Sequence, residues 1–239
     1  MGIFGHVGYC VDRKIDLFLI HQKFREKRVA NAEKAVSADR RDVRRQQLIE
    51  ATISVIGRKG YAGTRLADVA SQAKVSYGVV GFYFRTKEDL LLATLQWLAD
   101  EYTSVWREAV EKAGPSPVAR LRAIIDADFS PRIASEKKIA VWYAFWAEGR
   151  TRPKYRNLCA QLYNDYHWQV RTIIEELIEQ GGHEAVDAHQ VTVALNAMTD
   201  GMWLDLQIQP RDFDRDEAKK AIEMFLAKVF PAEFGHGDQ

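Results

Sequence analysis

Residues 60–91, with the sequence GYAGTRLADVASQAKVSYGVVGFYFRTKEDLL, decide the fold class of this chain. Their pattern predicts two short helices, over 65–73 and from 76 to about 84, and the start of a third. We expect Thr64, Ser76 and Thr86 to cap these helices, because short hydroxyl side chains satisfy free backbone N–H groups at helix starts. Lys74 and Val75 would form the turn between the first two helices. Two capped helices joined by a brief turn make a helix-turn-helix, whose second helix fits the major groove of DNA.

Elements on both sides of this motif resemble the DNA-binding domain of the TetR family of bacterial transcription regulators. In chain order they are the lead helix Arg44–Gly57, the Gly60-Tyr61 turn, Thr64, the LADVA run at 66–70, Val75-Ser76, Tyr83-Phe84 and Lys87–Leu90. A lone helix-turn-helix pattern would be a weak signal, but here the elements follow the family's order over residues 44–91. The resemblance implies an all-α fold with a three-helix DNA-binding head at 44–91. It also implies a larger helical body at 92–239 that binds an effector and forms a homodimer.

Helical periodicity after the head predicts a body of five or six helices. Apolar residues recur at helical spacing from Lys87 to Lys112, and Gly or Pro residues separate the later candidates. The expected helices are 87–112, 118–129, 137–149, 153–180, 187–206 and 215–230. No run alternates in the manner of a strand, and no internal repeat is present. The sequence therefore predicts an all-α protein.

The composition is typical of a soluble globular protein. Of the 239 residues, 47% are hydrophobic and 28% are charged. No apolar run approaches the ~18 residues of a membrane span, and the N-terminus has no secretory signal, so we expect a cytoplasmic location and no membrane partner. Cys10 and Cys159 are far apart and have no neighbouring ligand residues, which favours a reducing compartment and no metal site.

The charge is divided between the two ends of the chain. Residues 1–90 hold 17 Lys or Arg and 10 Asp or Glu, a net charge of +7, whereas the remaining residues hold 17 and 23, a net charge of −6. A basic N-terminal part suits contact with phosphates, although such charge runs often mark solvated faces. Residues 1–43 precede the usual start of the family. We expect this extension to be flexible, and the alternatives are a basic arm that reaches the minor groove or an unused upstream start codon.

One face of the second motif helix is expected to read base pairs. Val79, Val80 and Phe84 have the spacing of a buried face. The residues left nearer the groove are Tyr77, Gly78, Gly81 and Phe82. Glycine permits close backbone approach, and phenylalanine can touch a thymine methyl group but cannot hydrogen-bond a base edge. The further DNA contacts that the resemblance implies are Thr64, Arg65, Ser76, Tyr83 and Lys87. For Tyr83 a core aromatic is the equal alternative, and Arg44 and Arg45 are either backbone contacts or solvated.

Two segments of the body, 140–147 and 199–204, resemble choline-responsive members of the same family. Quaternary ammonium ions bind to the faces of Trp and Tyr rings. The candidate ligand-binding residues are Trp142, Phe145, Trp146, Trp203 and Asp205. Glu148 and Asp200 are further candidates for the negative charge, although Asp200 also suits a structural hydrogen bond. An aromatic stripe at helical spacing is more often core or subunit interface. Position 205 is commonly basic in those relatives, so a different amine or an apolar effector is the alternative.

The subunit interface is expected on the last two long helices. The resemblance assigns Val191, Leu195, Ala221, Met224 and Phe225 to this region. Packing inside one subunit would give the same pattern. A two-fold dimer would read two half-sites of a palindromic operator.

These features predict a ligand-responsive transcriptional repressor that binds double-stranded DNA as a homodimer and senses choline or a similar cation. The alternative is a TetR-type repressor or activator that senses an unrelated lipophilic or amine effector. An enzyme is not expected, and no cofactor is implied. The six His residues lack metal-ligand spacing, and the chain has neither a nucleophile motif nor a glycine-rich phosphate loop. A protein that organises DNA without sequence preference is the third class.

Overall fold

The computed structural model of the protein describes residues 40–235. The chain divides into two compact units, residues 1–47 and 48–239. Of the first unit only residues 40–47 are described, and they are helical. The extension expected at 1–43 therefore lies outside the described residues, apart from residues 40–43.

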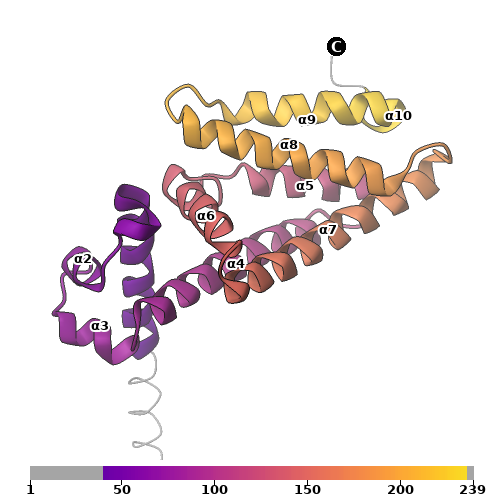
Figure 1. Ribbon diagram of the computed structural model, residues 1–239. Helices are drawn as coiled ribbons and strands as arrows, with labels where there is room; N and C mark the ends of the chain where they lie inside the picture. Colours follow the sequence, from indigo (N-terminus) through magenta and orange to yellow (C-terminus); the bar gives the residue numbers. More distant parts are fainter. Residues whose placement is uncertain (1–39, 236–239) are drawn as a thin grey trace, which may run out of the picture. The chain divides into compact units, whose positions relative to one another are not determined.

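The head consists of a helix that ends at residue 63, followed by α2 (Leu66–Gln72) and α3 (Tyr77–Tyr83) (Figure 1). Apolar side chains from all three helices are buried together, because each helix has one apolar face. They include Leu48, Ile56, Val69 and Val80. The expected helix-turn-helix is present, and its turn passes through Lys74, which adopts a left-handed conformation at φ 55°.

Two of the three expected residues occupy helix N-caps, and the third does not. Thr86 forms a capping box with Asp89: the Thr86 hydroxyl accepts from the Asp89 N–H at 3.0 Å, and the Asp89 carboxylate accepts from the Thr86 N–H at 3.1 Å. Ser76 occupies the N-cap of α3 but its side chain makes no capping hydrogen bond. The prediction that Thr64 caps α2 is wrong, because Arg65 occupies that position.

Thr64 instead holds the end of the first helix. Its side chain is buried, and its hydroxyl donates to the Gly60 carbonyl at 2.7 Å. The helix was expected to end near Gly57 with a turn at Gly60 and Tyr61, but helical structure continues to residue 63. Gly60 still has φ 70°, a conformation that glycine adopts without strain.

The body matches the expected helices to within two residues at each end. In chain order they are α4 (Lys87–Lys112), α5 (Pro117–Asp128), α6 (Glu136–Gly149), α7 (Pro153–Gly181), α8 (Ala188–Ile208) and α9 (Arg215–Val229). A short final helix, α10 (Pro231–Phe234), was not expected. Residues 40–235 contain no strand, so the all-α prediction is confirmed.

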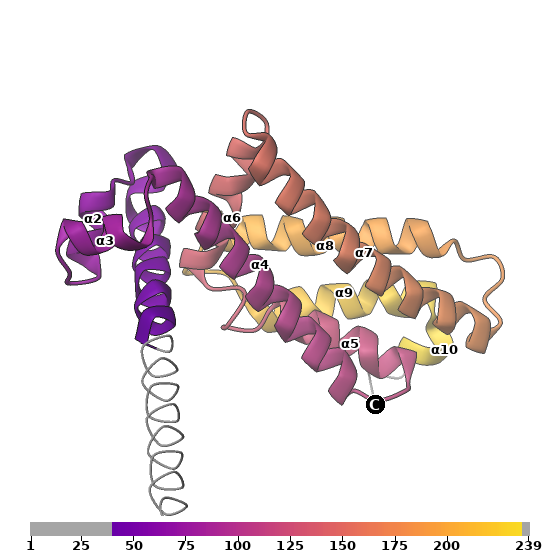
Figure 2. The ribbon, with the colours of Figure 1, turned by 90° about the horizontal axis from the view of Figure 1, so that it is seen from below.

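Helix packing places α4 and α7 at the centre of the body (Figures 1 and 2). Helix α4 packs against α5, α6 and α7, while α6 packs against α7 and α8. Helices α8 and α9 lie side by side. Since α4 also begins in the head at Lys87, one continuous helix belongs to both the head and the body.

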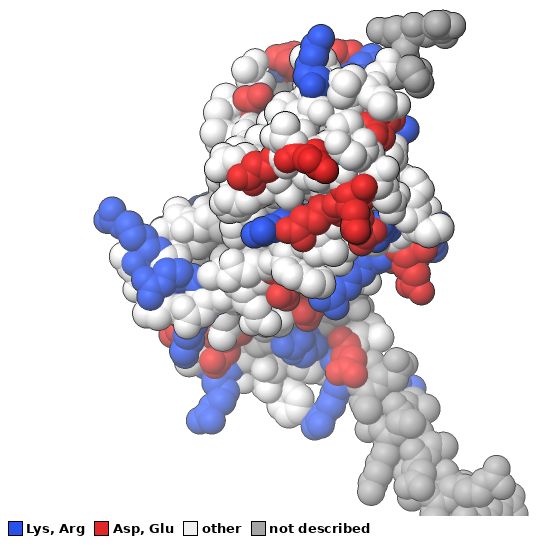
Figure 3. Space-filling view, turned by 90° about the vertical axis from the view of Figure 1, so that its right-hand side faces the viewer, with Lys and Arg blue, Asp and Glu red and all other residues white. Residues whose placement is uncertain are grey.

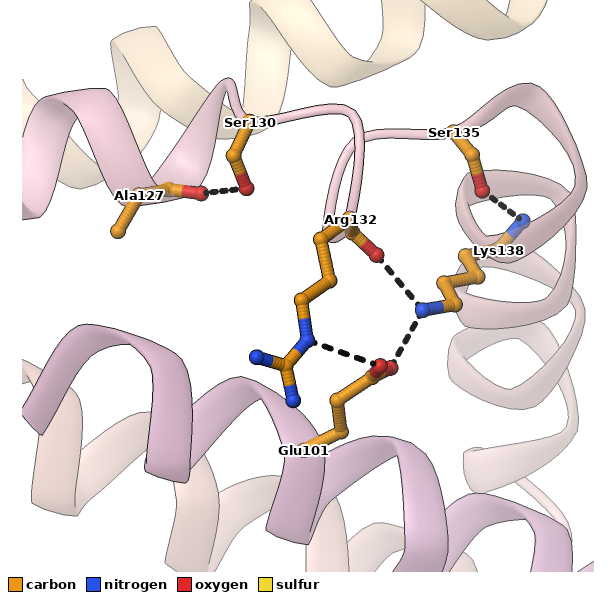
Figure 4. A network of polar contacts seen from close by, with 6 residues as sticks. All are labelled: Glu101, Ala127, Ser130, Arg132, Ser135 and Lys138. Carbon is orange, nitrogen blue, oxygen red and sulfur yellow. Dashed lines mark hydrogen bonds and ion pairs between the residues drawn. The ribbon is translucent and has the colours of Figure 1, made fainter. Parts of the chain in front are cut away.

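A partly buried ion pair joins α4 to the start of α6 (Figure 4). The Glu101 carboxylate accepts from the Lys138 ammonium at 2.5 Å, and Lys138 also donates to the Arg132 carbonyl at 2.6 Å. Arg132 approaches the same carboxylate at 3.4 Å. The Glu101 and Lys138 side chains are 12% and 17% exposed, so water screens their attraction less than at an open surface. This pair therefore fixes α6 relative to α4.

The charge asymmetry of the sequence is visible on the surface. Figure 3 shows acidic side chains gathered across the middle of one face, as expected for the acidic second part of the chain. Within residues 40–235, no helix is both long enough and apolar enough to cross a bilayer.

Candidate DNA-binding surface and effector cavity

Helix α3 presents an exposed face of unusual composition. Tyr77 is 60% exposed and Phe82 is 66% exposed, whereas Val80 and Phe84 are buried. This is the orientation that the sequence predicted, with Val79 half-buried at the edge. Two large exposed aromatic rings on a seven-residue helix indicate a contact surface for a partner.

Two glycines lie on the same face, and packing within the protein does not require either of them. A Cβ atom added at Gly81 would have nothing within 4 Å, and one added at Gly78 would meet only the Ser76 hydroxyl at 3.9 Å. Neither glycine has a positive φ. The fold of the described chain therefore gives no reason for a glycine at either position, and the backbone of α3 is open to approach from outside at both.

The residues expected to contact phosphates differ in their exposure and in the hydrogen bonds they make within the protein. Arg65 and Ser76 are exposed, and Tyr83 is half-buried with its ring against Phe82 at 5.2 Å between centroids. Thr64 is buried, and its backbone N–H donates to the Tyr61 carbonyl at 3.3 Å. Thus the hydroxyl and the N–H of Thr64 are both used inside the head.

Lys87 is also bound within the protein. Its ammonium donates to the carbonyls of Tyr61 and Ala62 at 3.1 and 3.5 Å and lies 5.3 Å from the Tyr61 ring centroid. Burial, and then the nearby charge of Arg152, lower the pKa of Lys87. Two of its three N–H donors are used in this way, which leaves one for a phosphate.

The turn between α6 and α7 meets the head at this lysine. The Tyr155 and Tyr61 hydroxyls are 3.1 Å apart. The Arg152 guanidinium lies 5.5 Å from the Tyr61 ring centroid and 5.9 Å from the Tyr155 ring centroid. Arg152 is held by Glu148 at 2.9 Å. Phe145 is fully buried behind both rings, with centroid distances of 6.0 Å to Tyr61 and 5.3 Å to Tyr155. These contacts form the head–body junction.

A cavity of about 500 Å³ lies between α4, α6, α7 and α8. Aromatic side chains from all four helices form much of its wall. They are Tyr102, Trp142, Trp146, Tyr163, Tyr166 and Trp203. Trp142 and Trp146 are neighbours at 6.2 Å between centroids, and Tyr102 contacts both Tyr166 and Trp203. Aromatic faces of this kind attract cations.

A buried carboxylate, that of Asp128, holds part of this wall in place. It accepts hydrogen bonds from the Tyr102 hydroxyl at 2.8 Å and from the Tyr166 hydroxyl. The Trp203 indole N–H donates to the Asp128 carbonyl at 3.1 Å. Burial raises the pKa of Asp128 to about 7 and raises those of both tyrosines well above the usual value. A negative charge therefore stands directly behind two cavity rings when Asp128 is ionised.

Polar groups on α8 complete the cavity. Asp200 is exposed as a whole residue, but burial of its carboxyl group raises its pKa to about 6. Asn196 is buried, and its Nδ2 has no hydrogen-bond partner among the described residues. A buried amide without a partner costs free energy, so this group is expected to bind something inside the cavity.

Of the five residues expected to bind the ligand, three line the cavity and two do not. Trp142, Trp146 and Trp203 line the cavity, as expected. Phe145 does not, because its ring packs into the head–body junction. Asp205 is exposed and lies outside the cavity wall. It is two residues beyond Trp203, about 200° further around α8, and so faces away.

The residues that sequence reasoning missed are Tyr102, Asp128, Tyr163, Tyr166 and Asn196. The spacing 196, 199, 200 and 203 on α8 is a usable signal in retrospect, since these positions share one helix face.

An exposed apolar stripe runs along α8. Its members are Val193, Ala197, Gly201, Leu204 and Ile208. Val191 and Leu195, expected at a subunit interface, are instead buried within the chain. On α9, Met224 is 64% exposed, while Ala221 and Phe225 are half-buried. An added Cβ at Gly201 would have nothing within 4 Å, so this glycine does not serve close packing inside the described chain.

Within residues 40–235, no group of three or more His, Cys, Asp or Glu side chains is placed to hold a metal ion. Cys159 lines the cavity as a free thiol, and burial raises its pKa to about 11. A thiol with a raised pKa is a poor nucleophile at neutral pH.

Comparisons with known proteins agree with this architecture. Residues 48–94 match the family described as "Bacterial regulatory proteins, tetR family", and residues 117–231 match "BetI-type transcriptional repressor, C-terminal". The HTH-type transcriptional regulator BetI of Paraburkholderia phymatum is 35% identical over 195 residues, which cover 79% of this chain and 95% of that relative.

Solved structures share the fold at lower identity. A transcriptional regulator from Saccharomonospora viridis, solved in complex with choline, has a TM-score of 0.67 at 22% identity over 76% of this chain and 94% of its own. The regulator FadR from Bacillus subtilis, in complex with stearoyl-CoA, has a TM-score of 0.64 at 19% identity over 77% and 97% of the two chains. At these identities the likeness concerns the fold alone.

Proposed function

Because the chain belongs to the TetR family of transcriptional regulators, with a BetI-type C-terminal part, we propose that it is an effector-responsive repressor of choline type. The repressor binds a palindromic operator as a homodimer in the cytoplasm, and a choline-like quaternary ammonium ion in the cavity releases it. The observation that carries the effector assignment is the aromatic cavity wall backed by the Asp128 carboxylate.

The operator is read by α3. Tyr77 and Phe82 enter the major groove, and Gly78 and Gly81 let the helix backbone approach the base edges. Arg65, Ser76, Tyr83 and the remaining donor of Lys87 contact phosphates, while Thr64 supports these contacts from inside the head. Since Phe82 offers no hydrogen bond to a base, DNA shape carries part of the specificity.

The homodimer forms through α8 and α9. The exposed stripe of Val193, Leu204 and Ile208, together with Met224, supplies apolar surface of the kind found at subunit interfaces. Gly201 and Ala197, in the middle of the stripe, allow two α8 helices to approach closely. This interface differs from the sequence expectation, because Val191 and Leu195 are used inside one chain.

Effector binding is coupled to DNA binding through the head–body junction. Trp146 and Gly149 line the cavity at the end of α6, and Arg152 and Tyr155 follow them within two helical turns. A ligand that moves the end of α6 therefore moves the residues that contact Tyr61 and Lys87. Tyr102 gives a second connection, because it belongs to α4, which enters the head.

The test is binding of the full-length protein to the DNA upstream of its own gene and of neighbouring genes, with and without choline. We expect choline to weaken specific binding by at least about fivefold, which is the low end of typical allosteric couplings. A Tyr155→Phe variant should keep choline binding but lose part of this effect. Equal DNA affinity with and without bound choline would overturn the coupling.

The alternative effector is a larger amine or a lipophilic molecule. The cavity of about 500 Å³ favours it, because a choline-sized ion fills only part of that space. In that case choline would give no heat of binding, whereas a bulkier amine or an acyl compound would bind and change the affinity for DNA. Transcription from the bound promoter, measured with and without the effector, separates a repressor from an activator.

A further inference from the structure

We propose that the cavity takes a small zwitterion, with its ammonium group against the tryptophans and its carboxylate held by Arg150 and Arg156. This assignment rests on the proposed function, namely that the aromatic wall binds an ammonium ion. It adds the second half of the ligand. An ammonium carboxylate such as trimethylglycine would thus be preferred over a simple cationic alcohol such as choline.

Arg150 and Arg156 both line the cavity: Arg150 is the C-cap of α6, and Arg156 lies in the first turn of α7. The two segments are in van der Waals contact here, since an added Cβ at Gly149 would lie 3.6 Å from the Arg156 Cα. Both side chains therefore start from the same side of the cavity. Both residues are exposed, which places them at its mouth.

Neither arginine has an ion-pair partner among the described residues. Other arginines of this region do: Arg152 pairs with Glu148 at 2.9 Å and Arg171 with Glu175 at 2.8 Å. Two unpaired guanidinium groups at one mouth form a binding site for an anion, and the planar fork of arginine fits a carboxylate in particular.

The opposite charge lies deeper in the cavity. Asp128 stands behind the rings of Tyr102 and Tyr166, and Trp203 is fixed on its carbonyl. Asp200, on α8, adds a second carboxylate at the exposed edge of the cavity. An ammonium group is therefore stabilised at the floor and a carboxylate at the mouth, so the two charges of a zwitterion match the two ends of the cavity.

Asn196 supplies an independent observation. Its side-chain amide is buried, lines the cavity and has an unpartnered Nδ2. An N–H donor in this position can bind a ligand oxygen, and it binds a carboxylate oxygen more strongly than a neutral hydroxyl, because bonds to a charged acceptor are stronger. The amide therefore favours a ligand that carries an oxygen acceptor, while the placement of the carboxylate at the mouth rests on the two arginines.

The experiment is calorimetric titration of the full-length protein with trimethylglycine, choline and tert-butylacetate, which has the shape of trimethylglycine without its positive charge. We expect trimethylglycine to bind at least about tenfold more tightly than choline, and tert-butylacetate to bind much more weakly. The double variant Arg150→Gln/Arg156→Gln should lose at least about tenfold in trimethylglycine affinity and keep its choline affinity. Unchanged choline binding also shows that the variant is folded.

Two further variants sharpen the result. Arg171→Gln, an exposed arginine of α7 outside the cavity, is the matched control and should change neither affinity. Asn196→Asp should strengthen choline binding relative to trimethylglycine binding, because a new carboxylate attracts the ammonium group of both ligands and repels the carboxylate of trimethylglycine alone. Choline binding as tightly as trimethylglycine, or equal losses for both ligands in the double variant, would overturn the zwitterion while leaving the cation site intact. Absence of binding by both ligands would overturn the proposed cation site itself.

Discussion

Replacing Gly81 with alanine separates the stability of α3 from its proposed role in DNA binding. An alanine Cβ at this position has nothing within 4 Å, and the residue has no positive φ, so the change introduces neither a clash nor strain. Alanine in a helix interior is more stable than glycine by roughly 0.5–1 kcal/mol. For a chain of this size the gain corresponds to an increase in Tm of about 1–4 °C.

The same substitution should harm DNA binding. If α3 lies close to the base edges at Gly81, a methyl group there forces the helix outward. We expect a loss of at least about tenfold in affinity for the specific operator, comparable to one mismatched base pair. Affinity for unrelated DNA should change little, because phosphate contacts dominate that binding. Fluorescence anisotropy with operator and scrambled duplexes measures both values.

Ser104→Ala is the matched control. Ser104 is exposed in the interior of α4, outside the helix-turn-helix, so the variant should also gain a little stability but keep its operator affinity. A Gly81→Ala protein that melts at a lower temperature would refute the assignment of open space around this residue. A more stable variant with normal operator affinity would refute the close approach of α3 to DNA.

Three other predictions follow from the contacts of buried groups. Lys87→Met should lower the free energy of unfolding by about 1–2 kcal/mol, because the Lys87 ammonium binds two carbonyls. It should also lower the salt slope of DNA binding by about one unit. In the control Lys154→Met, the lost ion pair is exposed, so stability should change little. Burial raises the pKa of Asp128 to about 7, so the folded state holds a proton that the unfolded state releases. Stability from this group should fall between about pH 4 and pH 7 and level off above, and Asp128→Asn should remove that slope from melting curves. Phe145→Ala should destabilise the fold by about 3–5 kcal/mol, whereas Trp146→Ala should cost less stability and weaken choline binding about tenfold in calorimetry.

The helices were predictable because residues close in sequence mark where each helix begins and ends. Pro117 and Pro153 begin two helices at their first position, and Gly182 ends α7 with φ 67°, a conformation suited to glycine. The Thr86 capping box with Asp89 depends only on residues three apart. Such interactions involve neighbours in sequence, and a single sequence contains them.

The cavity was less predictable because it depends on distant residues. Asp128 meets Tyr102 and Tyr166 across 26 and 38 residues of chain, and no periodicity links them. Phe145 and Trp146 are adjacent aromatics, and composition does not reveal that one packs on Tyr155 while the other faces empty space. The prediction for Thr64 was wrong for a similar reason. Its hydroxyl could either cap the start of α2 or donate to a carbonyl at the end of the preceding helix, and the fold selects the Gly60 carbonyl.

Under the proposed function, the length of α4 would convert a small tilt at the cavity into a larger displacement of the head. Tyr102 touches the cavity and Lys87 begins the helix in the head, so about 22 Å of helix separates the two at 1.5 Å per residue. A tilt of roughly 5° about the Tyr102 end would displace the other end by about 2 Å. In a two-fold dimer both arms swing, and the combined error of about 4 Å exceeds the ~3.4 Å rise of a base pair. Two reading heads that are wrong by a full base-pair step cannot occupy both half-sites at once.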